Sequence, residues 1–367
     1  MKSFFRVAVL LLIAVCIPSL AFSRGAGAQR DSQSGDFSVA LLIPYLGDQS
    51  FFDLAARGID LVNENLEGVS TRIIEIGTDE SRWQSFFIDA AEMGYDVILS
   101  CNWQIAPHMN AVAEMFPNQK FINFDIETSP GLPNVYSMFY ATNEIGYLCG
   151  VVAAAVAGSN MPLVNSQPLI GFIGGMDIPG INDFMVGYVA GARAVNPNIR
   201  IAISYVGGFQ DVATAKEIAL NQYRAGVNVI FAAAGNAGNG VIDAAHELNR
   251  YVIGVDSDQA LLFARTNRAI AERIITSGIK TIDQTILSSV RAARDGTLNW
   301  GEHKKYTFQD DGVGIARNEF FYAVLPREIQ AIISAQEEIL RSGRVEVPTA
   351  FTMDSGAISA FREAVRP

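Results

Sequence analysis

The sequence has few of the residues on which metal and nucleophilic chemistry depend. Among 367 residues there are three cysteines and three histidines. His108, His246 and His303 are scattered, with no HExxH pair and no second ligand at metal spacing. The GxSxG nucleophile elbow is also missing, and so is a glycine-rich loop followed by Lys-Ser or Lys-Thr. These absences argue against a metal centre, a serine hydrolase and a nucleotide triphosphatase.

Basic charge is also scarce. Lys and Arg number 27 against 38 Asp and Glu, a formal net charge of −11, which argues against a nucleic-acid partner. Half of the residues are hydrophobic and only 18% are charged, so the chain should fold rather than stay disordered. The length exceeds the size at which single cores stop growing and predicts two domains or lobes.

Long apolar runs are confined to the first residues. Lys2 and Arg6 precede an apolar run at residues 7–17, and Ala26-Gly27-Ala28 resembles a processing site. We therefore expect residues 1–28 to be a secretory signal peptide. No later stretch approaches the roughly 20 apolar residues that a membrane span needs. The mature protein is expected in the periplasm or elsewhere outside the cytoplasm.

The cysteines leave two questions open. Cys16 offers an alternative, a lipoprotein anchored to the cell membrane through an acylated cysteine. However, Val15 stands where a small residue is expected before such a cysteine, and Cys16 lies inside the apolar run. Cys101 and Cys149 have no metal-type spacing, and a disulfide between them cannot be inferred from sequence. We interpret both as core residues.

Short apolar runs alternate with segments of helical spacing along most of the chain. This alternation predicts parallel sheets covered by helices on both faces, an α/β fold with two doubly wound lobes. The tail adds a helix at residues 280–294, a strand pair at 305–316 and a helix at 328–341. The chain should cross between lobes more than once, with residues 36–141 plus 260–297 in the N-terminal lobe and 142–259 plus 298–367 in the C-terminal lobe. The expected strands are residues 38–43, 72–76, 97–101, 120–125, 135–139, 169–173, 201–206, 229–233 and 251–255.

Ligands of open parallel sheets bind beyond the carboxyl ends of the strands, so the loops there indicate function. These loops mix aromatic rings, carboxylates and glycines, which suits a ligand with a flat ring and hydroxyl groups. Phe51 and Phe209, one from each lobe, are expected to sandwich the ring, and carboxylates such as Asp256 to accept hydrogen bonds from hydroxyls. The candidate loop residues are Asp48, Ser50, Phe51, Trp103, Asp125, Phe209, Gly235, Asp256 and Asp258.

Structural roles remain alternatives for several of these residues. Asp48 and Asp53 stand at the start of the first expected helix, where a carboxylate caps the backbone. Phe52 lies on the apolar face of that helix and is expected in the core. Trp103 is equally consistent with a packed surface anchor, and the glycines at residues 235–240 with tight entry into a helix.

Several motifs together resemble the basic membrane protein family, the purine nucleoside receptors that serve ABC importers. The resemblance spans about residues 39–314. It is carried by Gly47-Asp48-Gln49-Ser50-Phe51, Lys120-Phe121 with Asp125, Glu144 with Tyr147-Leu148-Cys149-Gly150, Gly171-Phe172-Ile173-Gly174-Gly175, Gly254-Val255-Asp256-Ser257-Asp258-Gln259, and Thr276-Ser277-Gly278-Ile279-Lys280.

The resemblance implies a type I periplasmic binding protein fold, whose two lobes are joined by hinge crossovers and close on a small-molecule ligand. It implies that Phe51 and Phe209 stack on a purine base. Asp256 or Asp258 and Lys280 would hold the ribose hydroxyls, with backbone from Gly235 beside them. Asp48, Ser50 and Asp125 lie in matching loops, within reach of the base or its surroundings. The expected partner is an ABC transporter permease, and a monomer without cofactor or metal is expected.

Departures from the family pattern leave the ligand open. Phe52 stands where the family has Asn, and the polar residue expected after the first strand is replaced near Pro44 and Tyr45. Trp103 adds a wider ring surface than a purine requires, and the resemblance extends to riboflavin receptors, which makes riboflavin, with its ribityl hydroxyls, the alternative ligand. Two alternatives from other classes remain, a nucleoside hydrolase and a structural surface lipoprotein.

Overall fold

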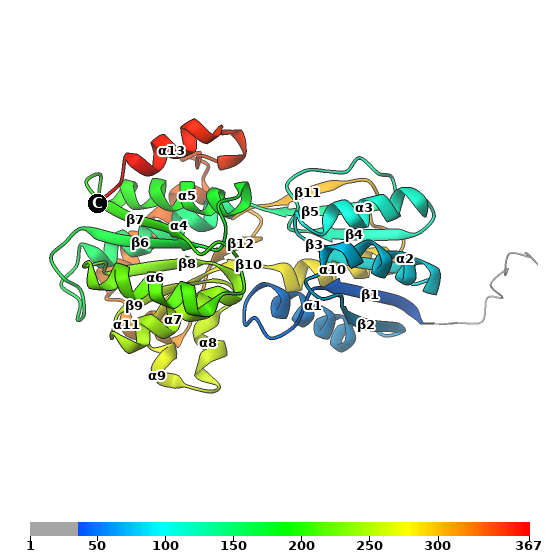
Figure 1. Cartoon of the computed structure of the whole chain (residues 1–367), viewed down its shortest axis with the longest axis horizontal. Coiled ribbons are helices and arrows are strands. Elements are labelled where there is room, and N and C mark those ends of the chain that lie inside the picture. The colour runs from blue at the N-terminus through cyan, green and yellow to red at the C-terminus, as the bar shows by residue number, and fades with distance from the viewer. Residues whose placement is uncertain (1–35) are drawn as a thin grey trace, which may run out of the picture. The chain divides into compact units, whose positions relative to one another are not determined.

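The computed structural model describes residues 36–367, so the predicted signal peptide and the alternative lipid attachment at Cys16 lie outside the described residues. The described part contains two six-stranded sheets (Figure 1). Their strand orders are β11-β5-β4-β3-β1-β2 in the first sheet and β12-β10-β9-β8-β6-β7 in the second. The predicted α/β architecture with two mostly parallel sheets is confirmed.

All neighbouring strands of the first sheet are parallel. Parallel neighbours need crossover connections, and helices supply most of them. The strands are β1 (Phe37–Ile43), β2 (Val69–Glu75), β3 (Val97–Cys101), β4 (Lys120–Phe124), β5 (Val135–Tyr140) and β11 (His303–Tyr306). The helices that accompany them are α1 (Phe51–Asn65), α2 (Trp83–Met93), α3 (Ala106–Met115) and α10 (Ile282–Arg294), with the short helix η1 (Glu80–Arg82).

The second sheet is parallel except for its edge strand β12, which runs antiparallel to β10. Its strands are β6 (Leu169–Gly174), β7 (Arg200–Tyr205), β8 (Val229–Ala233), β9 (Tyr251–Asp256), β10 (Ile274–Lys280) and β12 (Val313–Ile315). The accompanying helices are α4 (Thr142–Ala157), α5 (Pro179–Val195), α6 (Val212–Arg224), α7 (Gly238–Glu247), α8 (Gln259–Ala264), α9 (Arg268–Ala271), α11 (Glu319–Val324), α12 (Arg327–Arg341) and α13 (Ser355–Glu363), with η2 (Gly235–Ala237) and η3 (Ala350–Thr352).

Within residues 36–367 the chain passes between the two sheets at three places, from β5 to α4, from β10 to α10, and from β11 to β12. The strand pair predicted at residues 305–316 is therefore wrong. β11 pairs with β5 and β12 pairs with β10, so the loop between them joins the sheets and forms no hairpin.

Sheet membership also differs from the expected lobe boundaries. Residues 260–297 were expected in the N-terminal lobe, but β10 within them pairs with β9 of the second sheet, while α10 packs on α1. Residues 298–367 were expected in the C-terminal lobe, but β11 within them joins the first sheet. Pairing with a distant strand leaves no local signal in a sequence, which explains both differences.

Helices α4 and α5 pack with their backbones in contact. A Cβ on Gly187 would overlap the carbonyl oxygen of Asn143, and one on Gly191 would overlap that of Tyr147. All residues of α4 except Glu144 are buried, because strands and helices cover this helix on all sides. This tight pair fixes the start of α4, which leads directly from the first crossing between the sheets.

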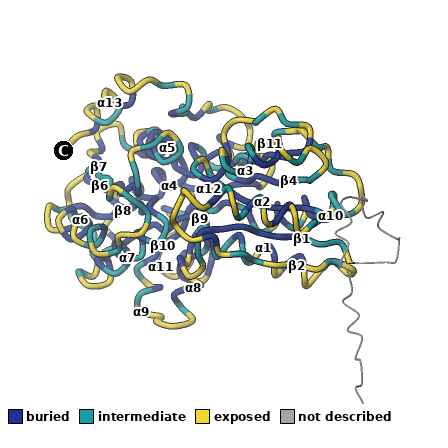
Figure 2. Tube along the Cα trace, turned by 45° about the vertical axis from the view of Figure 1, so that its right-hand side comes forward, coloured by how far each residue is buried: buried dark blue, intermediate teal, exposed yellow. Residues whose placement is uncertain are grey.

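The core lies along the strands, and Figure 2 shows β1 and β4 as largely buried. Cys101 in β3 and Cys149 in α4 are fully buried and free, which confirms their interpretation as core residues. Burial raises the pKa of both thiols above the ordinary value. Between residues 36 and 367, no helix combines the length and the apolar character needed to cross a membrane.

Candidate functional site

Loops at the carboxyl ends of both sheets line a cavity of about 470 Å³. Cavities of roughly 300–1,000 Å³ commonly hold small molecules. Aromatic rings make up much of the wall. They are Tyr45, Phe51, Phe52, Trp83, Trp103, Phe139, Phe184, Phe209 and Phe351.

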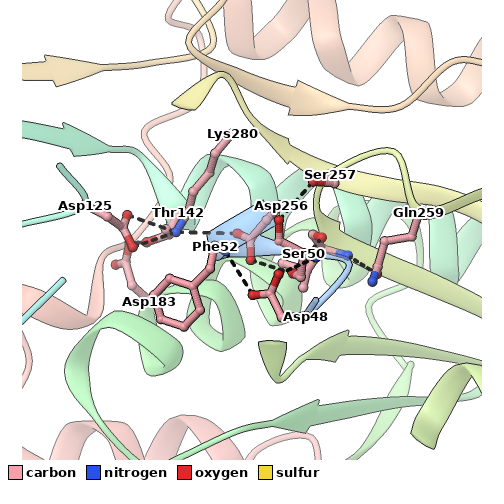
Figure 3. Close-up of polar contacts among 11 residues, drawn as sticks. Asp48, Ser50, Phe52, Asp125, Thr142, Asp183, Asp256, Ser257, Gln259 and Lys280 are labelled. Atoms are coloured by element: carbon pink, nitrogen blue, oxygen red, sulfur yellow. Dashed lines mark hydrogen bonds and ion pairs between the residues drawn. The ribbon is translucent and has the colours of Figure 1, made fainter. Parts of the chain in front are cut away.

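A buried ammonium group lies between two carboxylates in the wall of this cavity (Figure 3). Lys280 is the last residue of β10, and its Nζ donates to both carboxylate oxygens of Asp125 at 2.9 Å. The same Nζ lies 3.6 Å from Oδ1 of Asp256. It also lies over the rings of Phe51 and Phe184, at 5.3 and 5.2 Å from the ring centres. Residues from both sheets thus meet at one cation.

The charges of this cluster do not cancel, because one ammonium faces two carboxylates. Burial lowers the pKa of Lys280, but Asp125 and Asp256 raise it overall above the ordinary value, so the lysine is a cation. Burial raises the pKa of Asp256, and Lys280 opposes that effect. A buried group with excess negative charge is stabilised by added hydrogen-bond donors. The cluster is therefore suited to a ligand that brings hydroxyl groups.

The backbone at both carboxylates adopts the left-handed conformation. Asp125 has φ of 60° and Asp256 has φ of 64°, and Asn102, which also lines the cavity, has 58°. Residues other than glycine adopt this conformation at a cost, and such strain concentrates at functional sites. All three residues stand at the carboxyl end of a strand or directly after it.

Ser50 does not line the cavity but orients a residue that does. Its Oγ donates to Oδ2 of Asp256 at 3.0 Å, and its carbonyl oxygen accepts from Oγ of Ser257 at 3.1 Å. Nε2 of Gln259 donates to the carbonyl oxygen of Gln49 at 3.1 Å. The loop before α1 is thus hydrogen-bonded to the loop after β9, which belongs to the other sheet.

Asp48 lines the cavity, but backbone amides occupy its oxygens. Oδ1 accepts from the amides of Ser50 and Asp53, and Oδ2 accepts from that of Phe52 at 2.9 Å. These amides begin α1, so the capping alternative describes its contacts. Burial raises the pKa of Asp48 to about 6, although the three amides lower it. Asp53 likewise accepts from the amides of Gly47 and Gln49.

Asp258 lies outside the cavity wall and has a similar structural role. Its Oδ1 accepts from the amide of Leu261 at 3.2 Å, which caps α8. Both of its oxygens also accept from Nδ2 of Asn318, at 2.7 and 2.9 Å. Of the two aspartates offered for the hydroxyl groups, Asp256 alone lines the cavity.

The remaining predicted residues line the cavity. The ring of Phe209 packs against Gly175, where a Cβ would overlap it, and close to Gly235, which has φ of 54°. Trp103 is 49% exposed, which indicates a place at the mouth. Phe52 was expected in the core and is 9% exposed, yet it lines the cavity too, with its ring edge-on to that of Phe51 at 5.3 Å.

Sequence reasoning missed several rings of the wall. Phe139 is in the fifth expected strand. Its place near the end of that strand was a signal in the sequence for a position in the cavity wall. Tyr45 follows the first strand by two residues and was noted only as a departure from the family. Phe184 in α5 and Phe351 near the C-terminus had no local signal. Among residues 36–367, no group of three or more His, Cys, Asp or Glu side chains is arranged to hold a metal ion.

Two sheets with a shared cavity at their strand ends define a class of protein, the two-lobed α/β solute-binding fold. A solved ABC transporter system solute-binding protein from Aeropyrum pernix K1 has this fold, with a TM-score of 0.77 and 22% identity over 90% of this chain and 99% of that one. The family model described as ABC transporter substrate-binding protein PnrA-like matches residues 38–349, and the chain belongs to this family.

Relatives of known name support this membership. ABC transporter nucleoside-binding protein BmpA of Lactococcus lactis subsp. cremoris (strain MG1363) is 27% identical over 362 residues, 95% of this chain and 99% of that protein. Basic membrane protein D of Borreliella burgdorferi (strain JD1) is 35% identical over 189 residues, 51% of each chain. The predicted family is confirmed. The chain is a substrate-binding protein of an ABC transporter, with a small-molecule ligand and a permease as partners, and it acts outside the cytoplasm.

Proposed function

We propose that this protein binds a purine nucleoside in the cavity between its two sheets, as a monomer, and delivers it to the permease without changing it chemically. The observation that carries the proposal is the Asp125, Lys280 and Asp256 cluster beside the ring of Phe51. It offers buried acceptors for sugar hydroxyls next to an aromatic surface for a base.

The aromatic part of the ligand is recognised by rings from both sheets. Phe51 begins α1 beside the first sheet, and Phe209 follows β7 in the second, and both line the cavity. Stacking between a base and an aromatic ring is worth about 1–3 kcal/mol. A ring held from two sides therefore contributes a large part of a micromolar affinity, which corresponds to about −8 kcal/mol.

The charged residues of the wall favour a neutral ligand. Lys280 is the one basic residue among the described residues that line the cavity, and Asp125 and Asp256 already surround it. Glu80 and Glu127 add further negative charge to the wall. A phosphate group would meet repulsion without a free cation, so we expect the nucleoside to bind and the corresponding nucleotide to be rejected.

The relatives point in the same direction. The Lactococcus protein named a nucleoside-binding protein aligns over nearly the full length of both chains. Membership in a family of substrate-binding proteins also favours capture over catalysis.

We expect transport to depend on a shift in population between an open and a closed arrangement of the cavity. Ser50 and Asp256 come from opposite sheets and are hydrogen-bonded at 3.0 Å, so the arrangement that closes the cavity also orients the acceptor. A ligand that contacts both walls stabilises this arrangement over an open one. The permease then recognises the closed form.

Identification of the carried ligand tests the proposal. Protein purified under mild conditions is denatured, and the released small molecule is identified by mass and absorbance. Calorimetric titration with inosine, adenosine and the matching monophosphates follows. We expect a purine nucleoside in the released fraction, and binding of nucleosides at least 100-fold tighter than of monophosphates. Equal binding of inosine and its monophosphate would contradict the charge argument.

Riboflavin is the second candidate, because Trp83 and Trp103 both line the cavity and widen its aromatic surface. Its ribityl hydroxyls would use the same acceptors. A yellow released fraction with flavin absorption favours this ligand over a nucleoside. A hydrolase would instead convert added nucleoside into free base with turnover, and we expect no base to accumulate.

A further inference from the structure

After α12 the chain continues to residue 367, and this last stretch packs against α5 of the second sheet. The stretch at residues 343–367, here named the C-terminal segment, contains η3 and α13. Figure 1 shows α13, in red, next to α5. The segment ends firmly packed, because Val365 is fully buried and its carbonyl oxygen accepts from the amide of Ile201 at 2.8 Å. The family match ends at residue 349, before both Phe351 and α13.

One anchor of the segment is Asp183 of α5, which is fully buried. Its Oδ1 accepts from Oγ1 of Thr349 at 2.6 Å and from the amide of Ala350 at 2.9 Å. Its Oδ2 accepts from Oγ1 of Thr142 at 2.6 Å and from the amide of Asn143 at 2.9 Å. One carboxylate thus joins the C-terminal segment to the beginning of α4, next to the first crossing between the sheets. Four hydrogen bonds to one buried carboxylate fix the backbone before Phe351.

A second anchor holds α13. The guanidinium of Arg362 donates to the carboxylate of Asp177 at 2.6 and 2.9 Å. It also donates to Oδ1 of Asn182 and to the hydroxyl of Tyr205, each at 2.9 Å. Asp177 stands between two residues of the cavity wall, Met176 and Ile178. The segment therefore supports a wall loop at one end and contributes to the wall itself at the other.

Between the two anchors, η3 directs Phe351 to the cavity. Its ring meets that of Phe139 edge to face, with the centres 5.4 Å apart and the planes at 76°. Phe139 belongs to β5 of the first sheet, whereas Phe351 is anchored to helices of the second. Glu127 and Thr142 line the same cavity. The pair of rings is thus a contact between the two sides of the site.

From these contacts we infer that the C-terminal segment places Phe351 in the binding site, and that Phe351 is a specificity-determining residue that limits the space available to the ligand. The inference rests on the proposed function and extends it to a wall that the family match does not cover. A ring fixed by anchors on both sides loses little freedom when a ligand binds. The ring of Phe351 therefore adds affinity for a ligand that fits the cavity and excludes a ligand that would extend into the space of the ring.

The test compares two phenylalanines of the same segment. Phe351→Ala removes the ring at the cavity, whereas Phe361→Ala removes a half-buried ring of α13 that does not line the cavity. Phe351→Leu is a third variant that keeps apolar bulk and guards against loss of folding. Each protein, with wild type, is titrated calorimetrically with adenosine, guanosine, inosine, uridine and riboflavin. Circular dichroism records that each variant is folded.

We expect Phe351→Ala to weaken binding of the preferred nucleoside about 10-fold and to change the ratios of affinities across the panel, with Phe351→Leu between it and wild type. Phe361→Ala should leave those ratios within about 2-fold of wild type. If both Phe351 variants bound the panel with wild-type affinities and wild-type affinity ratios, the inference would be overturned and the proposed function would stand. Failure of wild type to bind any nucleoside of the panel overturns the proposed function and the inference with it.

Discussion

Four of the predicted site residues are aspartates that follow strands, and they divide into two pairs. Asp125 and Asp256 have a left-handed backbone conformation and lie at or directly after the last residue of a strand. Both face the ammonium of Lys280. Asp48 and Asp258 lie a few residues further along. Backbone amides at the start of α1 occupy the oxygens of Asp48, whereas a backbone amide of α8 and Nδ2 of Asn318 occupy those of Asp258. The first pair has acceptor capacity directed to the cavity, whereas the second pair stabilises helix ends.

The difference shows that distance from the strand end separates the two roles. A carboxylate directly at a parallel strand's end emerges where ligands bind. One placed two or more residues later meets the free amides of the next helix, which are strong competitors for its oxygens. The predictions below test this division, from the largest expected effect to the smallest.

Removal of the shared cation should have the largest effect. Lys280→Met leaves the carboxylates of Asp125 and Asp256 buried without a partner. Loss of one member of such a buried group costs about 3–5 kcal/mol. We expect this loss in the free energy of unfolding, measured with urea, and no detectable nucleoside binding by calorimetry. Lys280→Arg, which keeps the charge, is the control and should retain most of the stability. A Lys280→Met protein as stable as wild type would show that the cluster is not an ionic unit.

The cap formed by Asp48 predicts a pH dependence of stability. Burial raises the pKa of Asp48 from 3.8 to about 6. Between these values the folded chain holds more protons at this group than the unfolded chain, so its contribution to the free energy of unfolding falls as pH rises. The difference corresponds to about 3 kcal/mol, present in full below about pH 4 and lost above about pH 6.

Asp48→Asn removes that titration. We expect the difference in unfolding free energy between the variant and wild type to shift in the variant's favour from pH 4 to pH 6.5, as measured by urea denaturation at several pH values. Asp53→Asn serves as the comparison, because it changes a second carboxylate that accepts from backbone amides of the same loop. A pH-independent difference for Asp48→Asn would argue against a buried, titrating cap.

The two aspartates of the motif Asp256-Ser257-Asp258 should respond in opposite ways to the same change. Asp256→Asn is expected to weaken nucleoside binding by about 1.5–3 kcal/mol, the value of a charge-assisted hydrogen bond. It should cost little stability, because Lys280 keeps the carboxylate of Asp125 as its partner. Asp258→Asn is expected to cost about 1 kcal/mol of stability through its cap and to bind normally. Calorimetric titration and thermal melting of both variants separate these outcomes, and an exchange of the two results would reverse the division of roles.

Loss of one ring should have the smallest effect. Phe209→Ala removes an aromatic wall of the second sheet, and we expect affinity to fall by about 0.5–1.5 kcal/mol beyond the loss of buried area. Trp103→Ala, at the exposed mouth, should have less effect on a nucleoside and more on riboflavin. Fluorescence or calorimetric titration of both ligands measures this contrast. An unchanged affinity in Phe209→Ala would remove that ring from the site.

Much of the fold was predictable because it follows from local patterns. Apolar runs such as residues 97–101 and 229–233 alternate with helical spacing, and parallel sheets follow from that alternation. The same rule placed Phe51, Asp125 and Asp256 in loops that the structure brings to one cavity. For these residues the local pattern was sufficient to predict a place near the cavity.

The rest depended on contacts between distant residues. Lys280 was expected to open a helix, but it ends β10, and its partner Asp125 is 155 positions away. Phe351 reaches the cavity because Asp183 anchors the residues before it. Asp258 is also held by the side-chain amide of Asn318, which is 60 positions away. No pattern within a short window carries such information.

The most direct test of the central claim compares a ribonucleoside with its 2′,3′-dideoxy analogue on wild type, Asp256→Asn and Asp258→Asn. Calorimetric titration should give a preference of at least 10-fold for the ribonucleoside in wild type and in Asp258→Asn, and nearly equal affinities in Asp256→Asn. If Asp258→Asn lost the preference while Asp256→Asn kept it, the assignment of the hydroxyl groups to the buried cluster around Lys280 would be contradicted.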